Sequence, residues 1–418
     1  MENGQILQDI TFLIENYQND YYNMEDMKGL LYDAVNEILE MAVSHGFEGD
    51  LWHNYLTYLM ASHENAYSTS CEIVGSVDGS INQVALHDFE IFKELFDYDF
   101  TDMESVMGVD CISMLHDYVG TSGHGSVFNQ RIRDRICDLS KSLAKAETAE
   151  EFKAVITQFY KEFGVGKLGL HKAFRIAHTE EGALIEPITK IAHVHLDDLV
   201  GYEIAKKKLI DNTKAFVEGK KANNCLLFGD AGTGKSSSIK AILNQYYDQG
   251  LRMIEVYKHQ FKDLNDVIAQ IKNRNYKFII YMDDLSFEEF EIEYKYLKAV
   301  IEGGLEKKPD NVLIYATSNR RHLIRETFKD KEDRDEELHT NDTVQEKLSL
   351  VARFGVTIYF GKPDKKQFQE IVRELAKKNG IDMSDDELFL EANKWELSHG
   401  GLSGRTAQQF IDYLAGTR

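Results

Sequence analysis

A glycine-rich segment carrying a lysine and three serines occupies residues 229–238, and its first nine residues, GDAGTGKSS, fit the pattern G-x-x-x-x-G-K-[ST] in full. The glycines allow backbone N–H groups to turn inward around an anion, and Lys235 can reach the β and γ phosphates of a nucleotide. The segment lies between a predicted strand and a predicted helix, whose N-terminus would face the same anion. We therefore predict a nucleotide-binding loop made of Gly229, Asp230, Ala231, Gly232, Thr233, Gly234, Lys235, Ser236 and Ser237.

Two adjacent carboxylates follow an apolar run at residues 278–284, FIIYMDD. A carboxylate at the end of a strand can hold Mg²⁺ beside a bound triphosphate, and the serine hydroxyl of the loop can be a second ligand. An aspartate at a strand end can also serve as a helix cap or turn residue. With the phosphate loop in the same chain, we expect Asp283 and Ser236 to hold Mg²⁺.

Three further polar residues stand where strands or helices begin or end. Asn319 ends the apolar run of NVLIYATSN and could orient an attacking water, although asparagine also ends strands for turn reasons. Arg353 closes a helix before the last predicted strand, and Arg405 opens the last predicted helix. From spacing alone, each arginine is equally compatible with a surface position.

Continuously apolar strands alternate with helical patterns between residues 196 and 362, which indicates a parallel sheet covered on both faces. Pro363 follows, and three helical patterns complete the chain. Residues 1–165 show mainly helical periodicity. The predicted organisation is an acidic, mainly α-helical N-terminal domain (1–165), a connector (166–195), an α/β nucleotide-binding core (196–362) and a small helical subdomain (363–418).

Negative charge is concentrated in the first half of the chain. The net charge is −22, and residues 1–195 hold 13 Lys and Arg against 32 Asp and Glu, so 13 − 32 = −19. Up to Gln130 the only basic side chains are Lys28 and Lys93. Such a surface repels phosphate backbones, which argues against nucleic-acid binding by this half. It is either a solvated acidic surface or a docking face for a basic protein partner.

The remaining composition is that of an ordinary globular protein, with 43% hydrophobic and 28% charged residues. The N-terminal residues MENGQILQDI lack the basic and apolar regions of a signal peptide, and no apolar run reaches the roughly 18 residues of a membrane span. The four cysteines are scattered, as expected for reduced thiols. We expect a cytoplasmic location without membrane attachment.

Taken together, these stretches resemble the AAA+ superfamily of P-loop ATPases. GDAGTGKSS looks like its Walker A motif, FIIYMDD like Walker B, ATSN like sensor 1, VARF like the box with the arginine finger, and GLSGRTAQ like sensor 2. The resemblance runs from about residue 196 to the C-terminus. More closely, DDLVGYE, LKAVIEGGLE, PDNVLIYATSNRRHLI and EKLSLVARFG resemble the bacterial predicted-ATPase family known as domain of unknown function 815.

The resemblance implies ATP and Mg²⁺ as ligands and assigns roles to particular residues. Asn319 would be the sensor-1 residue, and Val200 and Gly201 in LVGYE would lie against the adenine. Arg353 would reach the γ phosphate of a neighbouring subunit, whereas Arg405 would contact the γ phosphate of its own subunit from a helical lid. An arginine acting between subunits implies a homo-oligomer, as a ring or a helical assembly.

Asp284 stands where AAA+ enzymes usually carry a catalytic glutamate. An aspartate can still serve as the base that activates water, because positioning dominates phosphoryl transfer. We take Asp284 as this base in preference to Glu288 or Glu289, which we expect to begin the next helix and to face solvent. The sequence thus predicts an ATPase, slow or dependent on assembly, that drives conformational work on an unidentified protein partner. The alternatives are an ATP-dependent switch or scaffold with little or no hydrolysis, and a motor on nucleic acid resembling a helicase loader.

Overall fold

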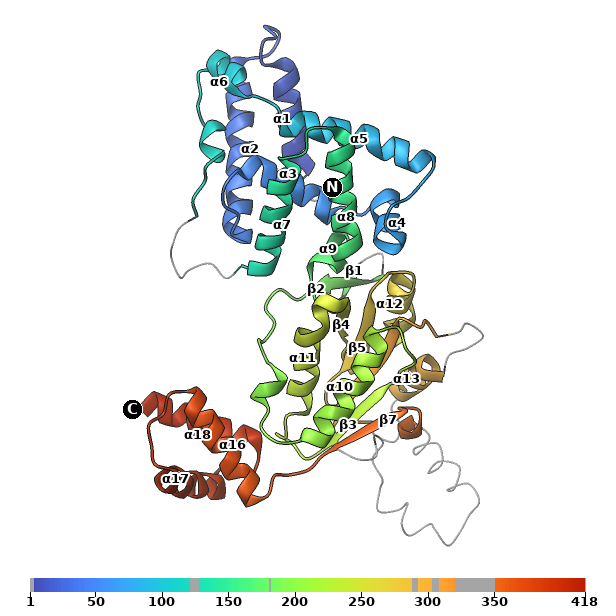
Figure 1. Cartoon of the computed structure of the whole chain (residues 1–418), viewed down its shortest axis with the longest axis vertical. Coiled ribbons are helices and arrows are strands. Elements are labelled where there is room, and N and C mark those ends of the chain that lie inside the picture. Colours follow the sequence, from blue (N-terminus) through green and yellow to red (C-terminus); the bar gives the residue numbers. More distant parts are fainter. Residues whose placement is uncertain are drawn as a thin grey trace. The chain divides into compact units, whose positions relative to one another are not determined.

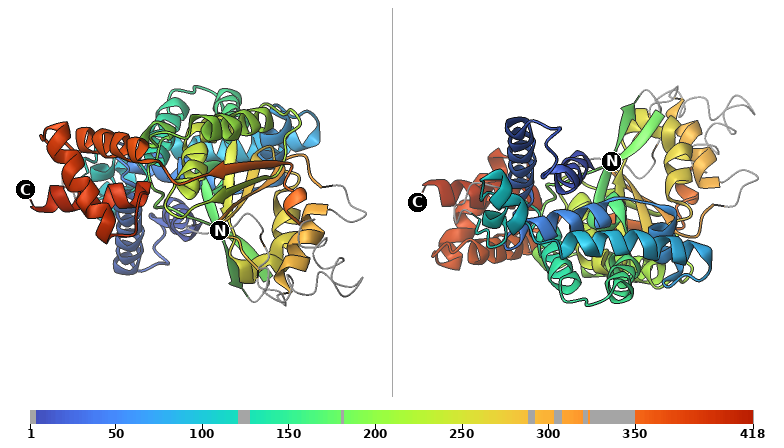
Figure 2. Two further views of the ribbon diagram at one scale, coloured as in Figure 1. Left: turned by 90° about the horizontal axis from the view of Figure 1, so that it is seen from below. Right: turned by 90° about the horizontal axis from the view of Figure 1, so that it is seen from above.

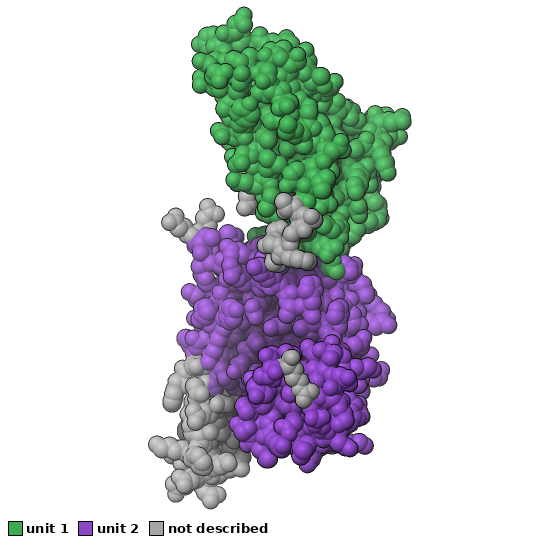
Figure 3. Space-filling view, turned by 90° about the vertical axis from the view of Figure 1, so that its left-hand side faces the viewer, with its two compact units in different colours: residues 1–171 green, residues 172–418 purple. Residues whose placement is uncertain are grey.

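The computed structural model of the chain describes residues 4–120, 128–179, 182–287, 292–302, 308–319, 323 and 350–417. The chain divides into two compact units, residues 1–171 and residues 172–418, which Figure 3 distinguishes by colour. This division falls inside the range 166–195 that we expected to be a connector. Each unit is described by itself below.

Unit 1 is built from helices whose ends carry recognisable capping residues. The Asn23 side chain accepts a hydrogen bond from the Glu25 amide at the start of α2, and Gly46 ends that helix with a φ of 72°. The helices are α1 (Gly4–Asn16), α2 (Met24–His45), α3 (Leu51–Ser62), α4 (Ala66–Val74), α5 (Ser80–Phe96), α6 (Thr101–Met107), α7 (Gln130–Leu143), α8 (Ala149–Phe163) and α9 (Gly166–Leu170) (Figure 1).

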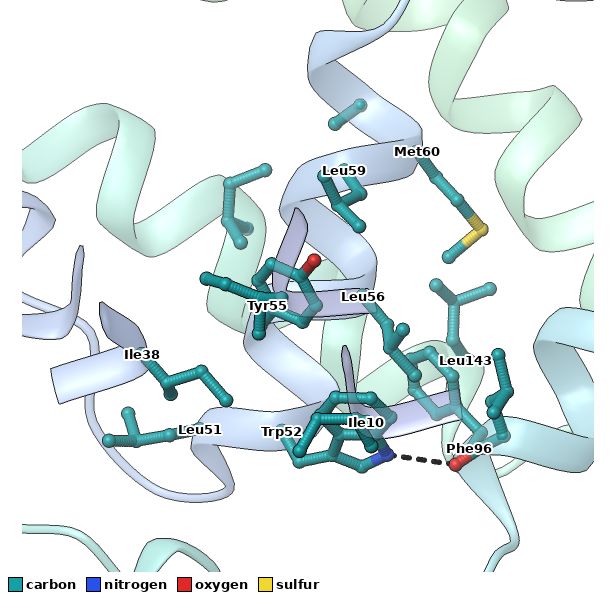
Figure 4. Close-up of a cluster of buried hydrophobic side chains, with 14 of the residues drawn as sticks. Ile10, Ile38, Leu51, Trp52, Tyr55, Leu56, Leu59, Met60, Phe96 and Leu143 are labelled. Carbon is teal, nitrogen blue, oxygen red and sulfur yellow. Dashed lines mark hydrogen bonds between the residues drawn. The ribbon is translucent and has the colours of Figure 1, made fainter. Parts of the chain in front are cut away.

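A single apolar core holds these helices together, and Figure 4 shows its centre. Trp52 and Tyr55 of α3 are fully buried there, and the Trp52 indole N–H donates to the Leu95 carbonyl over 2.8 Å. Tyr160 of α8 is also buried, and its hydroxyl donates to the Met60 carbonyl at 2.9 Å. The buried polar groups of these large side chains are therefore satisfied by backbone, which fixes α3 against α5 and α8.

Unit 2 contains a seven-stranded sheet of order β2-β1-β4-β5-β6-β3-β7. Neighbouring strands are parallel except for β1 and β2, which form an antiparallel pair. The strands are β1 (Ala173–Thr179), β2 (Gly182–Pro187), β3 (Cys225–Gly229), β4 (Leu251–Glu255), β5 (Lys277–Met282), β6 (Val312–Ser318) and β7 (Val356–Phe360).

Helices lie on both faces of this sheet (Figure 2). On one face, Leu209 of α10 and Ile242 of α11 pack in a common cluster with Leu227, Ile279 and Tyr315 of the strands. The intervening strand residues are buried as well, as expected for a sheet covered on both sides. The flanking helices are α10 (Glu203–Val217), α11 (Lys235–Tyr246), α12 (Leu264–Ile271) and α13 (Glu293–Glu302), with short 3-10 turns at Leu196–Asp198, Tyr247–Gln249 and Lys258–Asp263.

The C-terminal part of unit 2 is a three-helix lid with its own small core. Phe368, Val372, Ala392 and Ile411 are buried in that core, and Val200 packs against it from outside the lid. The lid helices are α16 (Lys365–Lys378), α17 (Asp385–Ser398) and α18 (Gly404–Thr417). The predicted fold class, a mainly parallel sheet flanked by helices with C-terminal helices and a helical N-terminal region, is confirmed.

The β1–β2 hairpin lies within the range predicted as a connector. β1 pairs in parallel with β4, with Phe174 opposite Ile254, so the hairpin lengthens the sheet beyond β4. Its burial alternates along the strands, because one face of the hairpin remains open to solvent. Over the described residues, no helix is long and apolar enough to cross a membrane.

Candidate functional site

The residues of the glycine-rich loop connect β3, which lies between β6 and the edge strand β7, to the N-terminus of α11. Gly229 has a φ of 136°, and a Cβ there would stand 2.1 Å from the Phe360 carbonyl oxygen of β7. Only glycine fits such a close approach of two strands. Gly232 and Gly234 also have positive φ values, 75° and 90°, so the loop turns back toward α11. The local sequence thus shapes a cradle of backbone N–H groups.

Polar side chains meet at the carboxyl ends of β3, β5 and β6, which are neighbours in the sheet. Ser236 Oγ donates to Asp283 Oδ1 at 2.7 Å. Thr317 Oγ1 donates to the same oxygen at 2.5 Å and accepts the Asp284 backbone N–H at 2.9 Å. One hydroxyl therefore fixes the side chain of one aspartate and the backbone of the other.

Lys235 and Asp284 are joined through Asn319. The Lys235 ammonium donates to Asn319 Oδ1 at 3.0 Å, and Asn319 Nδ2 donates to Asp284 Oδ1 at 2.8 Å. Lys235 also donates to the carbonyls of Gly229 and Asp230, at 3.1 and 2.6 Å. Asp284 has a φ of 50°, a left-handed conformation that aspartate and asparagine tolerate better than most residues.

Burial and hydrogen bonding shift the pKa values of Lys235 and Asp283 in this site. Burial lowers the pKa of the Lys235 ammonium, and the nearby carboxylates of Asp284, Asp230 and Asp283 only partly offset this effect. For Asp283, burial raises the pKa, but the hydrogen bonds donated by Thr317 and Ser236 outweigh it. The Asp283 pKa is therefore below its usual value, and this carboxylate stays charged at neutral pH.

A cavity of about 660 Å³ lies over the loop and is closed on one side by the lid. This volume falls within the roughly 300–1,000 Å³ of ligand pockets. Leu199 and Val200 line its apolar part together with Ile371 and Leu375 of α16. The Arg405 amide donates to the Gly232 carbonyl at 3.2 Å, so the N-terminus of α18 touches the loop.

The sequence-predicted residues divide between the cavity lining and its surroundings. Those in the lining are Val200, Ala231, Gly232, Thr233, Gly234, Lys235, Ser236, Ser237, Asp283, Asp284, Asn319 and Arg405. Outside the lining, Gly229 supports the loop from β3, and Asp230 accepts the Lys362 amide at 3.0 Å. Gly201 lies between two lining residues, with a φ of 80°.

Arg353 also lies outside the cavity lining. It forms an ion pair with Glu302 at the end of α13, while its Nη1 is buried and has no hydrogen-bond partner within the described ranges. Its guanidinium therefore does not belong to the site of its own chain in this structure. Glu288 and Glu289, the other candidates for the base, lie outside the described residues.

Lining residues that the sequence analysis did not single out include Asp198, Ile371, Leu375, Gly404 and Gln408. Asp198 forms an ion pair with Lys378 of the lid at 2.7 Å. Ile371 and Leu375 are spaced like ordinary core residues of an amphipathic helix, so their periodicity gave no signal of a ligand. Only the docking of the lid on the loop brings them to the cavity.

The chemistry of the donor set fits magnesium and a nucleotide. Ser236 and Asp283 offer hydroxyl and carboxylate oxygens, which suit a hard cation that retains waters and phosphate ligands. In the described part of the chain, no cluster of three or more His, Cys, Asp or Glu residues could hold a metal by itself. The fold and the site together define an α/β protein with a P-loop between the parallel strand β3 and the helix α11.

The family model described as "Protein of unknown function (DUF815)" matches residues 169–418, and the chain belongs to this family. No curated protein matches the chain. Among solved structures, the chain is 16% identical to the RuvB Holliday junction branch migration motor of Thermotoga maritima, with a TM-score of 0.36, over 52% of this chain and 63% of that one. It is also 16% identical to the FIGL-1 AAA domain in complex with ADP, with a TM-score of 0.38, over 55% of this chain and 75% of that one.

Proposed function

We propose that this protein binds ATP with Mg²⁺ and hydrolyses it to ADP and phosphate, driving conformational work on a protein partner. One observation carries the proposal, namely the chain of contacts from Lys235 through Asn319 to Asp284, beside the pair of Ser236 and Asp283. The proposal thus rests on a candidate phosphate-binding cation, a candidate metal pair and a candidate base that lie together at the carboxyl ends of neighbouring strands. Family membership supports the same fold without naming a substrate.

In the proposed ground state, the loop amides and Lys235 bind the β and γ phosphates. Leu199, Val200 and Ile371 provide apolar contacts for the adenine ring of the nucleotide. Ser236 and Asp283 would hold Mg²⁺, which supplies neutralisation of charge on the phosphate oxygens. Asp283 is suited to this role because its depressed pKa keeps it anionic.

In the proposed reaction, a water oxygen bonds to the γ phosphorus as the bond to the β–γ bridging oxygen breaks. Asp284 accepts the water proton, and Asn319 orients the carboxylate and the water. Arg405 contacts the γ phosphate from the lid and so links the position of the lid to the nucleotide state. The second arginine, Arg353, acts from a neighbouring subunit of a homo-oligomer, where it stabilises charge in the transition state.

A switch that binds ATP and hydrolyses it slowly or not at all is the second candidate. A specific observation favours it, because Asp284 Oδ1 already accepts the Asn319 amide and its side chain is one methylene shorter than glutamate. The acidic charge of unit 1 supports a protein partner over nucleic acid in either case.

Equilibrium binding of ATP to Lys235→Ala tests the nucleotide site itself. We expect binding at least about tenfold weaker than that of the wild type, because a charge-assisted phosphate contact is lost. Lys207→Ala is the matched control, since Lys207 is an exposed lysine of α10 paired with Asp211. Equal ATP affinity in both variants would contradict the proposed site.

A further inference from the structure

A second hollow lies wholly within unit 1, lined by residues of α1, α3, α4, α5 and α8. Its volume is about 480 Å³, which is within the roughly 300–1,000 Å³ range of ligand pockets. We call it the α5 groove, and the residues that matter below are Leu59, Met60, Tyr67, Val84, Phe89 and Ile91. The nucleotide site of unit 2 uses none of them.

Side chains from the core form the base of the α5 groove, and exposed aliphatic side chains form one wall. Leu59, Met60 and Phe89 are buried members of the unit 1 core. Val84 and Ile91 of α5 are 64% and 46% exposed. They are seven residues apart, two turns of helix, and therefore lie along one side of α5. Scattered exposed aliphatic residues are ordinary, but a row that continues into an apolar hollow indicates a binding surface.

The charge around the groove is negative. Asp88 lines the groove between Val84 and Ile91, is exposed, and has no hydrogen bond or ion pair among the described residues. Unit 1 carries 10 Lys and Arg against 29 Asp and Glu over residues 1–171, so 10 − 29 = −19. An uncompensated carboxylate beside an apolar wall favours a ligand that carries both aliphatic groups and cations.

The cations of unit 1 do not offset this charge at the groove. Lys28 and Lys93 are the only two before Gln130, and they pair with Glu25 and Asp97. Lys153 lies 6.0 Å from the centre of the Tyr67 ring, but it lines a neighbouring hollow and not the groove.

Backbone geometry narrows the conformation of the ligand. The described residues of unit 1 contain no strand, only an isolated bridge between Gly49 and Tyr118. An extended peptide would therefore find no sheet edge with which to pair, whereas an amphipathic helix can bind through side chains alone. The negative charge also repels the anionic surface of a membrane.

We propose that the α5 groove binds a basic amphipathic helix of a partner protein, which places two or three aliphatic side chains in the groove and lysines or arginines near Asp88. This inference gives a location and a chemistry to the partner recognition included in the proposed function. The inference rests on the proposed function only for the role of the partner. The groove lies within unit 1, so peptide binding itself does not require ATP hydrolysis in unit 2.

The test uses the full-length protein and a fluorescein-labelled model helix of about 18 residues made of leucine and lysine, with leucines at i, i+3, i+4 and i+7. A twin peptide has glutamate in place of every lysine. The groove variant is Val84→Ser with Ile91→Ser, and its control is Val43→Ser, because Val43 is 54% exposed on α2 outside the groove. Asp88→Lys tests the charge, and Asp33→Lys on α2 is its control.

We expect the basic peptide to bind the wild type and both controls equally in fluorescence anisotropy. The groove variant should bind it roughly tenfold more weakly, Asp88→Lys should weaken binding several-fold, and the acidic twin should not bind. Equal binding of the twin peptides, or equal binding by wild type and groove variant, would overturn the proposal. So would the absence of peptide binding, including the case in which only a small apolar dye binds.

Phosphate release from ATP, measured on the same proteins, separates this proposal from the proposed function. The groove variant should hydrolyse ATP like the wild type in the absence of peptide. A chain that binds the peptide through the groove without hydrolysing ATP supports the groove and contradicts the ATPase, while the opposite pattern contradicts the groove alone.

Discussion

Thr317 fixes the positions of the two aspartates of the site. Its hydroxyl donates to Asp283 and accepts the backbone N–H of Asp284, and the side chain is fully enclosed. The left-handed backbone of Asp284 needs such support, because an L-residue rarely adopts it without compensation. Thr317 is therefore a positioning residue that acts through both carboxylates.

Replacing Thr317 with valine keeps the shape of the side chain and removes the hydroxyl. We expect a loss of roughly 1–3 kcal/mol in the free energy of unfolding, because the Asp284 N–H loses its acceptor. The concentration of Mg²⁺ needed for half-maximal ATP turnover should rise as Asp283 loses a donor. Thr317→Ser is the control and should restore both properties; if serine behaves like valine, the hydroxyl has no such role.

At the scale of elements, the contact between the lid and the phosphate loop is the feature that completes the cavity. Gly232 accepts the Arg405 amide, and a Cβ at Gly232 would meet the Arg405 Cβ and the Ser403 Oγ, each at 3.1 Å. Its φ is 75°. A side chain there is therefore strained and also pushes against the first turn of α18.

Gly232→Ala should weaken ATP binding and lower stability by more than Gly219→Ala. Gly219 has a φ of 74°, almost the same, but a Cβ there meets nothing within 4 Å. The backbone strain of about 1 kcal/mol is thus common to both variants, and the difference reports the crowding of Gly232 against the lid together with its place in the cavity lining. Isothermal calorimetry and thermal unfolding of the two variants measure it. Equal ATP affinity in the pair would show that the lid contact does not shape the site.

Lys308, which precedes β6, is a partly buried cation outside the lining of the cavity over the glycine-rich loop. Its ammonium donates to Asn224 Oδ1 at 2.5 Å, and burial lowers its pKa from 10.5 to about 8. Below pH 8 the amine is charged in both the folded and the unfolded chain. The free energy of unfolding is therefore lowered by the whole desolvation penalty of the charged amine. Between pH 8 and 10.5 the unfolded chain binds more protons, so stability rises with pH.

Lys308→Met should therefore stabilise the protein at pH 7 by up to about 3 kcal/mol, the value that corresponds to this pKa difference. The advantage should shrink as the pH approaches 10. Denaturant unfolding of both proteins from pH 7 to 10 measures the gap, and a gap that stays constant with pH would contradict the depressed pKa.

Local sequence patterns predicted those elements that are determined by residues close together in the chain. The loop from Gly229 to Ser237 and the strand that ends at Asp283 could be recognised because their residues are contiguous and their periodicity is clear. Similarly, α2 ends at Gly46, whose left-handed backbone suits glycine, and Thr148 caps α8 by accepting the Glu151 amide at 3.2 Å. These features depend on neighbours in the sequence and need no tertiary information.

The features that the sequence did not reveal depend on distant contacts. The β1–β2 hairpin joins the sheet through β4, some 75 residues later, and its six- and seven-residue strands lie in a stretch without clear periodicity. The lid residues Ile371 and Leu375 have the same spacing whether they face a core or a ligand. Their role follows only from the docking of α18 on the loop.

At the level of the whole molecule, Arg353 is the residue through which the proposed function depends on a second subunit. It pairs with Glu302 and is absent from the cavity lining of its own chain. A proposal that gives Arg353 a place at the γ phosphate therefore requires an assembly. Turnover per chain should then increase with protein concentration as subunits associate.

Mixing two inactive variants tests whether Arg353 acts between subunits. Arg353→Ala retains Asp284 but lacks the arginine, and Asp284→Asn retains the arginine but lacks the base. Each should be at least about a hundredfold slower than the wild type, and the mixture should regain activity at the interfaces that combine both intact residues. An equimolar mixture that stays as slow as its parts would place the action of Arg353 within one chain or exclude it.

The proposed function depends most directly on Asp284 as the group that activates water for attack on ATP. Asparagine tolerates the same left-handed backbone and can accept the Asn319 amide, so Asp284→Asn removes the base with little change in structure. The direct measurement is single-turnover phosphate release from ATP and Mg²⁺, with protein in excess, for wild type and Asp284→Asn. We predict equal ATP affinity, release by the wild type that chelation of Mg²⁺ abolishes, and release by the variant that is slower by roughly a hundredfold or more. Equal rates in the two proteins would contradict this role of Asp284. So would ATP binding by the wild type without any phosphate release at concentrations at which it assembles.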